Sequence, residues 1–241
     1  MRVIVTENYE EMSRVAANII IDIVKSNPEA VLGLATGSSP IGTYDNMVKD
    51  HKENGTSYKN VKTVNLDEYV SLAPEHDQSY AYFMRKNLFD RVDIDLANTN
   101  LPSGIAPDAQ AECDRYNSLL DTVKQDVQLL GLGSNGHIGF NEPDSELIPN
   151  THLTALTDST IEANSRFFAS ENDVPKHALT MGIASVFKAR KIIVVASGAN
   201  KAEAIRATLC GNLTTNCPAS LLRLHPDVTI ICDEAAYSLC K

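Results

Sequence analysis

The sequence has no tryptophan, few cysteines, no long apolar run and no excess of basic residues. Its five cysteines (Cys113, Cys210, Cys217, Cys232 and Cys240) never stand at the C-x-x-C spacing of zinc or redox motifs. They indicate free thiols in a reducing compartment. No apolar run approaches the roughly 20 residues that cross a bilayer, and Met1–Thr6 turns polar too early for a signal peptide. We therefore expect a cytoplasmic protein that does not engage a membrane.

The charge is acidic, since 31 Asp and Glu against 21 Lys and Arg give a net charge of −10. An acidic surface repels phosphate backbones, so we expect no nucleic-acid partner, and an anionic ligand would need a local group of donors. With 241 residues, 43% hydrophobic and 22% charged, the composition is that of a globular protein. This length suits one α/β domain over residues 1–241.

Short β-branched runs alternate with amphipathic stretches along the chain. The runs predict strands, and the amphipathic stretches predict helices, the first opened by a capping box at Asn8-x-x-Glu11. The expected strands are residues 2–6, 30–34, 61–65, 127–131, 151–156, 191–196 and 228–232. The other expected helices are residues 40–54, 79–91, 108–122 and 159–168, with one more beginning near Lys201.

Strands that are apolar throughout predict a mostly parallel sheet with helices on both faces, an α/β fold. Such sheets bind ligands beyond the carboxyl ends of their strands. Polar residues follow four strands, in residues 35–40, 65–69, 131–143 and 196–201. We expect these four loops to converge on one site.

The first of these loops, Thr36-Gly37-Ser38-Ser39, joins a strand to a helix. We expect Ser39 to cap the helix and Pro40 to take its first position. Free N–H groups, hydroxyls and the positive helix end would form a phosphate cradle. The alternative is an ordinary capped turn.

The third loop begins with Gly131-Leu-Gly133-Ser-Asn-Gly136, which matches the G-x-G-x-x-G fingerprint of dinucleotide sites. That fingerprint requires a helix to start in the loop and an acidic residue about 20 positions later. A further glycine and a proline follow instead, up to Pro143. We therefore expect no dinucleotide and no other cofactor.

The same loop crowds Asn135, His137 and Glu142 together. A histidine on a glycine-flanked loop can move protons near neutral pH, and a nearby carboxylate can orient its ring. The alternative is a surface histidine. No second His or Cys stands at ligand spacing, so we expect no metal.

Three further side chains are candidates. Asp67 follows a strand and becomes a general base if burial raises its pKa; the alternative is an aspartate that caps a loop. Lys201 stands near a helix start, and both it and Arg166 are candidate partners of an anion; the alternative is solvated surface charge.

Together these segments resemble the glucosamine-6-phosphate deaminase (isomerase) family. The matching segments run in family order: residues 34–40, 65–70, 136–143, 164–168 and 228–234. The resemblance implies a modified Rossmann-like fold without a nucleotide. It also implies amino-sugar catabolism in N-acetylglucosamine degradation, by conversion of glucosamine 6-phosphate and water to fructose 6-phosphate and ammonia.

Residue roles follow from the same resemblance. His137 would open the sugar ring, Asp67 would move a proton from C2 to C1, and Glu142 would orient His137. Thr36, Gly37, Ser38, Ser39, Arg166 and Lys201 would hold the phosphate, and residues 151–175 would form a mobile lid. Many members have aspartate where this chain has Asn135, which adds no negative charge beside the imidazole.

Two other functions stay open: a 6-phosphogluconolactonase, and a non-catalytic sugar-phosphate sensor domain. Asp67-Glu68-Tyr69 favours the deaminase, because a lactonase needs no residue for C2 proton abstraction. The resemblance also bears on regulation, because hexameric family members that are activated by N-acetylglucosamine 6-phosphate have arginine and lysine on the strand after the Glu-Pro motif. In this chain the corresponding residues 150–155 carry no permanent cation. We therefore expect hyperbolic kinetics and a monomer rather than a hexamer.

Overall fold

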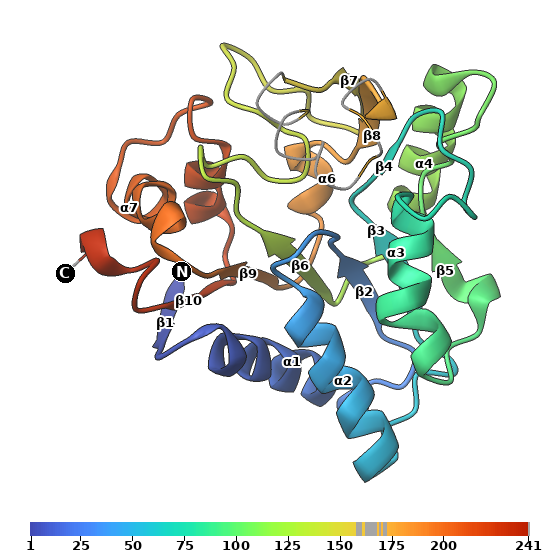
Figure 1. Ribbon diagram of the computed structural model, residues 1–241, viewed down its shortest axis with the longest axis horizontal. Coiled ribbons are helices and arrows are strands. Elements are labelled where there is room, and N and C mark those ends of the chain that lie inside the picture. Colours follow the sequence, from blue (N-terminus) through green and yellow to red (C-terminus); the bar gives the residue numbers. More distant parts are fainter. Residues whose placement is uncertain (158–160, 162–167, 169, 171–172, 241) are drawn as a thin grey trace.

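A parallel sheet forms the centre of the molecule (Figure 1). The computed structural model describes residues 1–157, 161, 168, 170 and 173–240. Within them, seven strands pair side by side, all in parallel. Their order is β1 (Arg2–Thr6), β10 (Val228–Asp233), β9 (Ile192–Ala196), β6 (Val127–Gly131), β2 (Val31–Leu34), β3 (Lys62–Asn65) and β5 (Thr99–Asn100). The predicted parallel α/β sheet is confirmed.

Helices cover both faces because successive strand residues point to opposite sides. In β9, Ile193 and Val195 pack into one core, and Ile192 and Val194 pack into the other. The first core includes α1 (Tyr9–Ser26), α2 (Ile41–Asn54) and α3 (Tyr80–Asn87). The second includes α4 (Ala109–Thr122), α6 (Ile183–Val186) and α7 (Ala202–Cys210). Short 3-10 turns complete the chain at Phe89–Arg91, Leu96–Asn98, Ala199–Lys201, Pro218–Leu224 and Ser238–Cys240.

The helix starts show one correct and one wrong prediction. Asn8 caps α1, and its Oδ1 accepts a hydrogen bond from the backbone N–H of Glu11 at 2.9 Å. The start of α2 differs, because Pro40 occupies the N-cap and no side chain at that position caps the helix. Ser39 is therefore not the cap. The hydroxyl of Tyr9, from α1, accepts the N–H of Gly42 instead.

A second, antiparallel sheet lies above the carboxyl ends of the first (Figure 1). It consists of β4 (Asp67–Tyr69), β8 (His177–Thr180) and β7 (His152–Ala155), with Asp67 opposite Thr180. The predicted strand at 151–156 is thus present, but it belongs to this small sheet. Most of the predicted helix at 159–168 lies outside the described residues.

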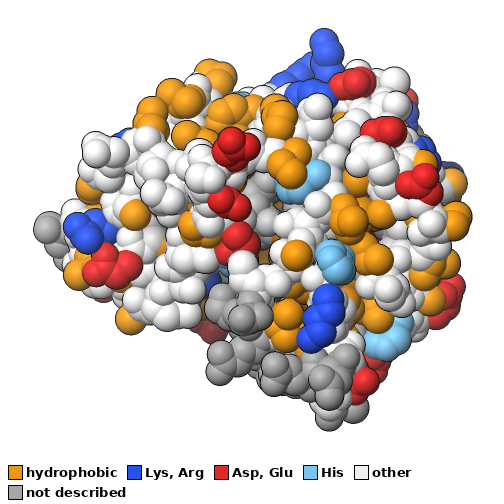
Figure 2. Space-filling model, turned by 90° about the horizontal axis from the view of Figure 1, so that it is seen from above, with side chains coloured by type: hydrophobic (Ala, Val, Ile, Leu, Met, Phe, Trp, Pro, Cys, Tyr) orange, Lys and Arg blue, Asp and Glu red, His pale blue; other side chains and the backbone are white. Residues whose placement is uncertain are grey.

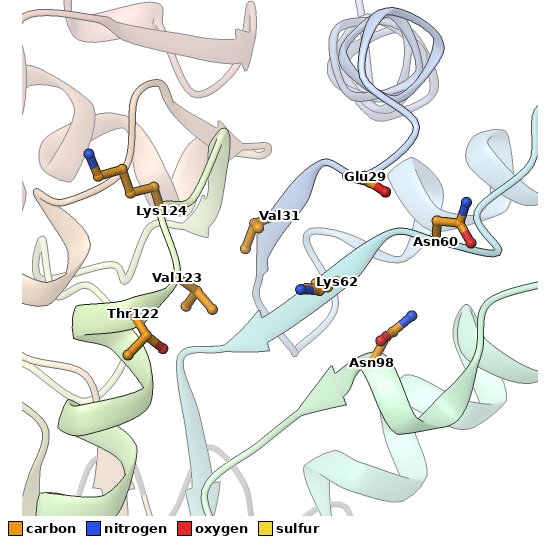
Figure 3. Close-up of a pocket in the computed structure, with 8 residues that line it drawn as sticks. All are labelled: Glu29, Val31, Asn60, Lys62, Asn98, Thr122, Val123 and Lys124. Carbon is orange, nitrogen blue, oxygen red and sulfur yellow. The ribbon is translucent and has the colours of Figure 1, made fainter.

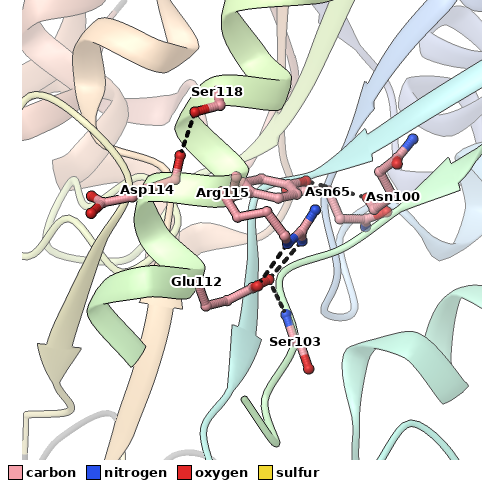
Figure 4. A network of polar contacts seen from close by, with 8 residues as sticks. Asn65, Asn100, Ser103, Glu112, Asp114, Arg115 and Ser118 are labelled. Atoms are coloured by element: carbon pink, nitrogen blue, oxygen red, sulfur yellow. Dashed lines mark hydrogen bonds and ion pairs between the residues drawn. The ribbon is translucent and has the colours of Figure 1, made fainter. Parts of the chain in front are cut away.

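A polar network fixes α4 against the loop that follows β5 (Figure 4). Glu112 accepts the N–H of Ser103 at 2.7 Å and forms an ion pair with Arg115 at 2.6 Å. The hydroxyl of Tyr116, also on α4, donates to the backbone oxygen of Asn65 at 2.7 Å. These contacts hold the end of β3 in place, two residues before Asp67.

None of the helices in the described part of the chain is long and apolar enough to cross a membrane.

Candidate active site

The carboxyl ends of the parallel strands bring three of the four predicted loops together. Gly139, in the loop after β6, lies so close to β4 that a methyl group on it would be 3.3 Å from Oδ2 of Asp67. At the start of that loop, a methyl group on Gly131 would be 3.9 Å from Cβ of Ser39. The loop after β6 therefore borders Asp67 and the loop after β2.

Asn135, His137 and Glu142 form a compact group within this loop. Oε2 of Glu142 accepts a hydrogen bond from Nδ2 of Asn135 at 2.8 Å and lies 3.1 Å from Nδ1 of His137. Oδ1 of Asn135 accepts the backbone N–H of His137 at 3.1 Å. Glu142 is thus placed to orient the imidazole, and Asn135 joins the two without adding charge.

Glycines give the loop its tight course. The N–H of Gly133 donates to the oxygen of His137 at 3.0 Å, and a side chain on Gly133 would overlap the imidazole ring. Gly136 has a φ of +86°, a left-handed conformation that glycine adopts at little cost. A methyl group there would also press on the sulfur of Cys217, at 2.6 Å. The glycines of the loop thus serve this turn, and no dinucleotide fingerprint is needed to explain them.

Asp67 is a buried carboxyl group, with 5% of its surface exposed. Burial, with a smaller contribution from the charge of Glu68, raises the pKa of Asp67 to about 8. Desolvation disfavours the charged form of a carboxyl group, which makes the ionised form a stronger base. Asp67 therefore has the proton affinity that a general base requires near neutral pH.

An aromatic cluster lies near Asp67, whose charge acts on the hydroxyl groups of Tyr69 and Tyr80. The rings of Tyr69 and Tyr80 lie 4.7 Å apart, and Phe140 stacks on Tyr80 at 6.2 Å. Phe168 contacts the edge of Tyr69, with ring centroids 6.2 Å apart. This apolar cluster packs around Tyr69, two residues after Asp67 in β4.

The loop of Thr36, Gly37, Ser38 and Ser39 keeps its backbone accessible. Gly37 has a φ of +91°, and Gly37 and Ser38 are exposed. At the start of the loop, the buried hydroxyl of Tyr44 donates to the oxygen of Ala35 at 2.5 Å. The loop is therefore anchored where it leaves β2.

Lys201 lies at the turn between β9 and α7. Asp233, at the end of β10, fixes this turn by accepting hydrogen bonds from Oγ of Ser197 at 2.5 Å and from N of Gly198 at 3.0 Å. Burial lowers the pKa of Lys201, and within the described part of the chain this ammonium forms no ion pair. A partly desolvated cation without an internal partner suits an anionic ligand. Arg166, the other predicted cation, lies outside the described residues.

Charged side chains on the face that is uppermost in Figure 1 are mixed in sign (Figure 2). There, Lys and Arg occur at scattered places among acidic, histidine and hydrophobic side chains. No group of three His, Cys, Asp or Glu side chains among the described residues could hold a metal ion.

A hollow of about 410 Å³ lies at the opposite end of the sheet, near the amino ends of β2 and β3, and is lined by Lys62 and Lys124 among others (Figure 3).

Three residues with evident roles were not predicted as site residues. Glu68 ties β4 to the start of α3, Tyr9 contacts the loop after β2, and Asp233 fixes the turn before Lys201. Each acts through backbone groups far away in the sequence, a relation that local patterns do not show. For Glu68, the sequence feature that could have indicated a role is its position next to Asp67.

Comparisons with known proteins agree with this geometry. The profile of the family "Glucosamine-6-phosphate isomerases/6-phosphogluconolactonase" matches residues 6–231. A glucosamine-6-phosphate deaminase of Geobacillus sp. (strain WCH70) is 52% identical over 240 residues, which cover 99% of this chain and 96% of that protein. A solved structure of a monomeric glucosamine-6-phosphate deaminase superimposes with a TM-score of 0.96 at 45% identity, covering 99% of this chain and 100% of the other. The 6-phosphogluconolactonase of Trypanosoma brucei shares the fold, with a TM-score of 0.78 at 20% identity over 98% of this chain and 97% of the other.

Proposed function

Because the chain belongs to the family of glucosamine-6-phosphate isomerases and 6-phosphogluconolactonases, we propose that it deaminates glucosamine 6-phosphate. Glucosamine 6-phosphate and water would give fructose 6-phosphate and ammonia. The observation that carries this proposal is the buried carboxyl group of Asp67, with a pKa of about 8, beside the loop that holds His137 and Glu142. Two glucosamine-6-phosphate deaminases that are 52% and 45% identical to this chain support the same reaction.

In this proposal His137 opens the pyranose ring by moving a proton from the O1 hydroxyl to O5. Glu142 holds Nδ1 of the imidazole, so that the other ring nitrogen is left for the sugar. Asn135 keeps Glu142 in position through its amide. The imidazole suits this step because its free nitrogen can take a proton from O1 and return it to O5.

Asp67 then acts on the open-chain sugar. Its carboxylate removes the proton from C2, and the electron pair forms the C1–C2 double bond of an enolamine as O1 gains a proton. Returning the proton to C1 gives an iminium ion at C2, which adds water. Loss of ammonia and of one proton from this adduct leaves the ketone of fructose 6-phosphate. One carboxyl group with a raised pKa can serve both transfers because it takes up and returns the same proton.

The phosphate would be held by Thr36, Gly37, Ser38 and Ser39 together with Lys201 and Arg166. The exposed backbone of the loop and the partly desolvated ammonium of Lys201 support this assignment. A lid over residues 151–175 belongs to the same proposal. Residues 158–160, 162–167, 169 and 171–172 of this segment lie outside the described residues. At its start, β7 joins β8, whose other neighbour β4 carries Asp67, so the segment begins beside the proposed base.

We further propose a monomer in the cytoplasm that binds no nucleic acid and is not regulated by a phosphorylated sugar. A 45% identical deaminase is described as monomeric, and the five cysteines are free thiols here. His152 is the only titratable side chain in residues 150–155, and burial lowers its pKa, which disfavours the charged form that a phosphate effector would need.

Rate curves are therefore expected to be hyperbolic and unchanged by N-acetylglucosamine 6-phosphate. Light scattering should give a mass near 26.2 kDa; a mass near six times that value would contradict the monomer.

One assay separates this function from its two alternatives. The purified protein is given glucosamine 6-phosphate, and ammonia and fructose 6-phosphate are measured; a parallel sample receives 6-phosphogluconolactone, and acid release is measured. Equimolar ammonia and fructose 6-phosphate support the deaminase. Acid release alone would indicate a lactonase, and calorimetric binding of the amino sugar without turnover would indicate a sensor.

A further inference from the structure

The hydroxyl of Tyr9 joins the first turn of α1 to the loop after β2. It donates a hydrogen bond to the backbone oxygen of Ser38 at 3.0 Å and accepts one from the backbone N–H of Gly42 at 2.8 Å. Ser38 is in the proposed phosphate loop, and Gly42 is in the first turn of α2. One hydroxyl group thus bonds both ends of the segment between Ser38 and Gly42.

This contact replaces a missing helix cap. The first N–H groups of a helix have no partner within it, and usually a side chain at the N-cap accepts one of them. Pro40 at the N-cap of α2 has no such side chain, and Ser39 does not supply one. Tyr9 satisfies the N–H of Gly42 from another helix, which leaves the hydroxyl of Ser39 available for a ligand.

The same contact determines where the loop N–H groups point. In a trans peptide the C=O and the following N–H point in opposite directions, and the described chain contains no cis peptide. Holding the oxygen of Ser38 toward Tyr9 therefore turns the N–H of Ser39 away from α1. The side chain of Ser39 borders Gly131 at the end of β6, so this part of the loop lies next to the loop that carries His137.

We propose that Tyr9 is a positioning residue for the phosphate group of the substrate. It does not touch the ligand; its hydroxyl keeps the loop of residues 36–39 in the form that presents N–H groups to an anion. The proposal rests on the proposed function, because the loop is taken to bind the phosphate of an amino sugar. Gly42 packs closely on α1, since a methyl group there would overlap Oγ of Ser13 and lie 3.0 Å from the ring of Tyr9.

The test uses Tyr9→Phe, which keeps the ring and removes the hydroxyl. Tyr58→Phe is the matched control, because the buried hydroxyl of Tyr58 has no hydrogen-bond partner in the described part of the chain. The loss of a hydrogen bond of about 1 kcal/mol corresponds to about fivefold in affinity. We expect Tyr9→Phe to raise KM for glucosamine 6-phosphate about fivefold with kcat within twofold, and Tyr58→Phe to change neither.

Inorganic phosphate separates this inference from the proposed function. Its dissociation constant, measured by calorimetry on the full chain, should rise in Tyr9→Phe by the same factor as KM, whether or not the protein turns over an amino sugar. A wild-type protein that binds phosphate but releases no ammonia would overturn the proposed function alone. Unchanged phosphate binding in Tyr9→Phe would overturn the inference, even if the variant melts at a lower temperature. So would a fall in kcat at constant KM.

Discussion

The carboxyl groups of Asp67 and Glu68 are adjacent in β4 but have different surroundings. Asp67 borders Gly139, whereas Glu68 accepts the backbone N–H groups of Tyr80 and Ala81 at the start of α3, both at 2.9 Å. Successive strand residues point to opposite sides, which separates the two groups. The charge of Glu68 nevertheless adds to burial in raising the pKa of Asp67.

Replacing Glu68 is expected to change the pH dependence of catalysis. A base with a pKa of about 8 loses activity below that pH, about tenfold per unit in kcat/KM. Glu68→Gln removes a negative neighbour, so the pKa of Asp67 falls and the acid limb of the kcat/KM profile moves to lower pH. Glu75→Gln makes the same charge change at an exposed position and should leave the limb unmoved. If the acid limbs of both variants coincide with that of the wild type, the charge of Glu68 does not affect the pKa of Asp67.

Asp67→Asn is expected to bind substrate but to lose turnover. An amide cannot accept the C2 proton, and loss of a general base typically lowers kcat by about 10² to 10⁴. Exchange of the C2 hydrogen with solvent deuterium, followed by NMR, should fall by the same factor. The dissociation constant for glucosamine 6-phosphate should stay within a few-fold. Exchange at the wild-type rate would assign the proton transfer to another group.

The same variant should be more stable than the wild type above about pH 4. Asp67 keeps its proton up to about pH 8 in the folded protein but releases it near pH 4 when unfolded. Between these values the unfolded chain binds fewer protons, so the wild-type free energy of unfolding decreases as pH rises. The amide introduced by Asp67→Asn does not ionise, so the melting temperature of the variant should exceed that of the wild type by a margin that grows from pH 4 to pH 8. Equal melting temperatures across this range would mean that Asp67 ionises freely.

Lys201→Ala is expected to weaken substrate binding. A charge-assisted hydrogen bond contributes about 1.5–3 kcal/mol, which corresponds to a KM increase of about tenfold or more. Lys62→Ala removes a lysine at the opposite ends of the strands and serves as the control (Figure 3). Both variants should melt close to the wild type, because neither lysine lies in the apolar core. A KM increase of the same size in both would mean that only the overall charge matters.

Most of the large sheet could be predicted from sequence, because its central strands are runs of apolar residues between polar turns. The edge strand β5 was missed, since Thr99–Asn100 is only two residues long and polar. Ile192–Ala196 and Val228–Asp233 are buried throughout and could fit only the interior of a covered sheet. The small sheet could not be predicted in this way. Asp67–Tyr69 is three residues long and carries two carboxyl groups, and its pairing with β8 depends on a partner more than 100 positions away.

In the candidate site, too, features with a local sequence pattern could be predicted, and features that depend on distant residues could not. Asp67 and the group of Asn135, His137 and Glu142 could be predicted because strand ends and glycine-rich loops concentrate chemistry locally. The start of α2 could not, because the side chain that bonds its N–H group comes from Tyr9, more than 30 positions earlier. Ser39 has the residue type and spacing of a helix cap, but the hydroxyl of Tyr9, from α1, accepts the N–H of Gly42 instead.

The proposed base and the proposed ring-opening group belong to different sheets. Asp67 is in the small antiparallel sheet, and His137 is on a loop that leaves the large parallel one. Proteins open in parts, and a sheet of three short strands is held by fewer interstrand hydrogen bonds than the seven-stranded central sheet, so we expect it to open at a lower free energy. If β4, β8 and β7 separate first on heating, the phosphate loop stays folded while the carboxyl group leaves the site. Thermal inactivation would then precede unfolding, and the inactivated protein would still bind inorganic phosphate.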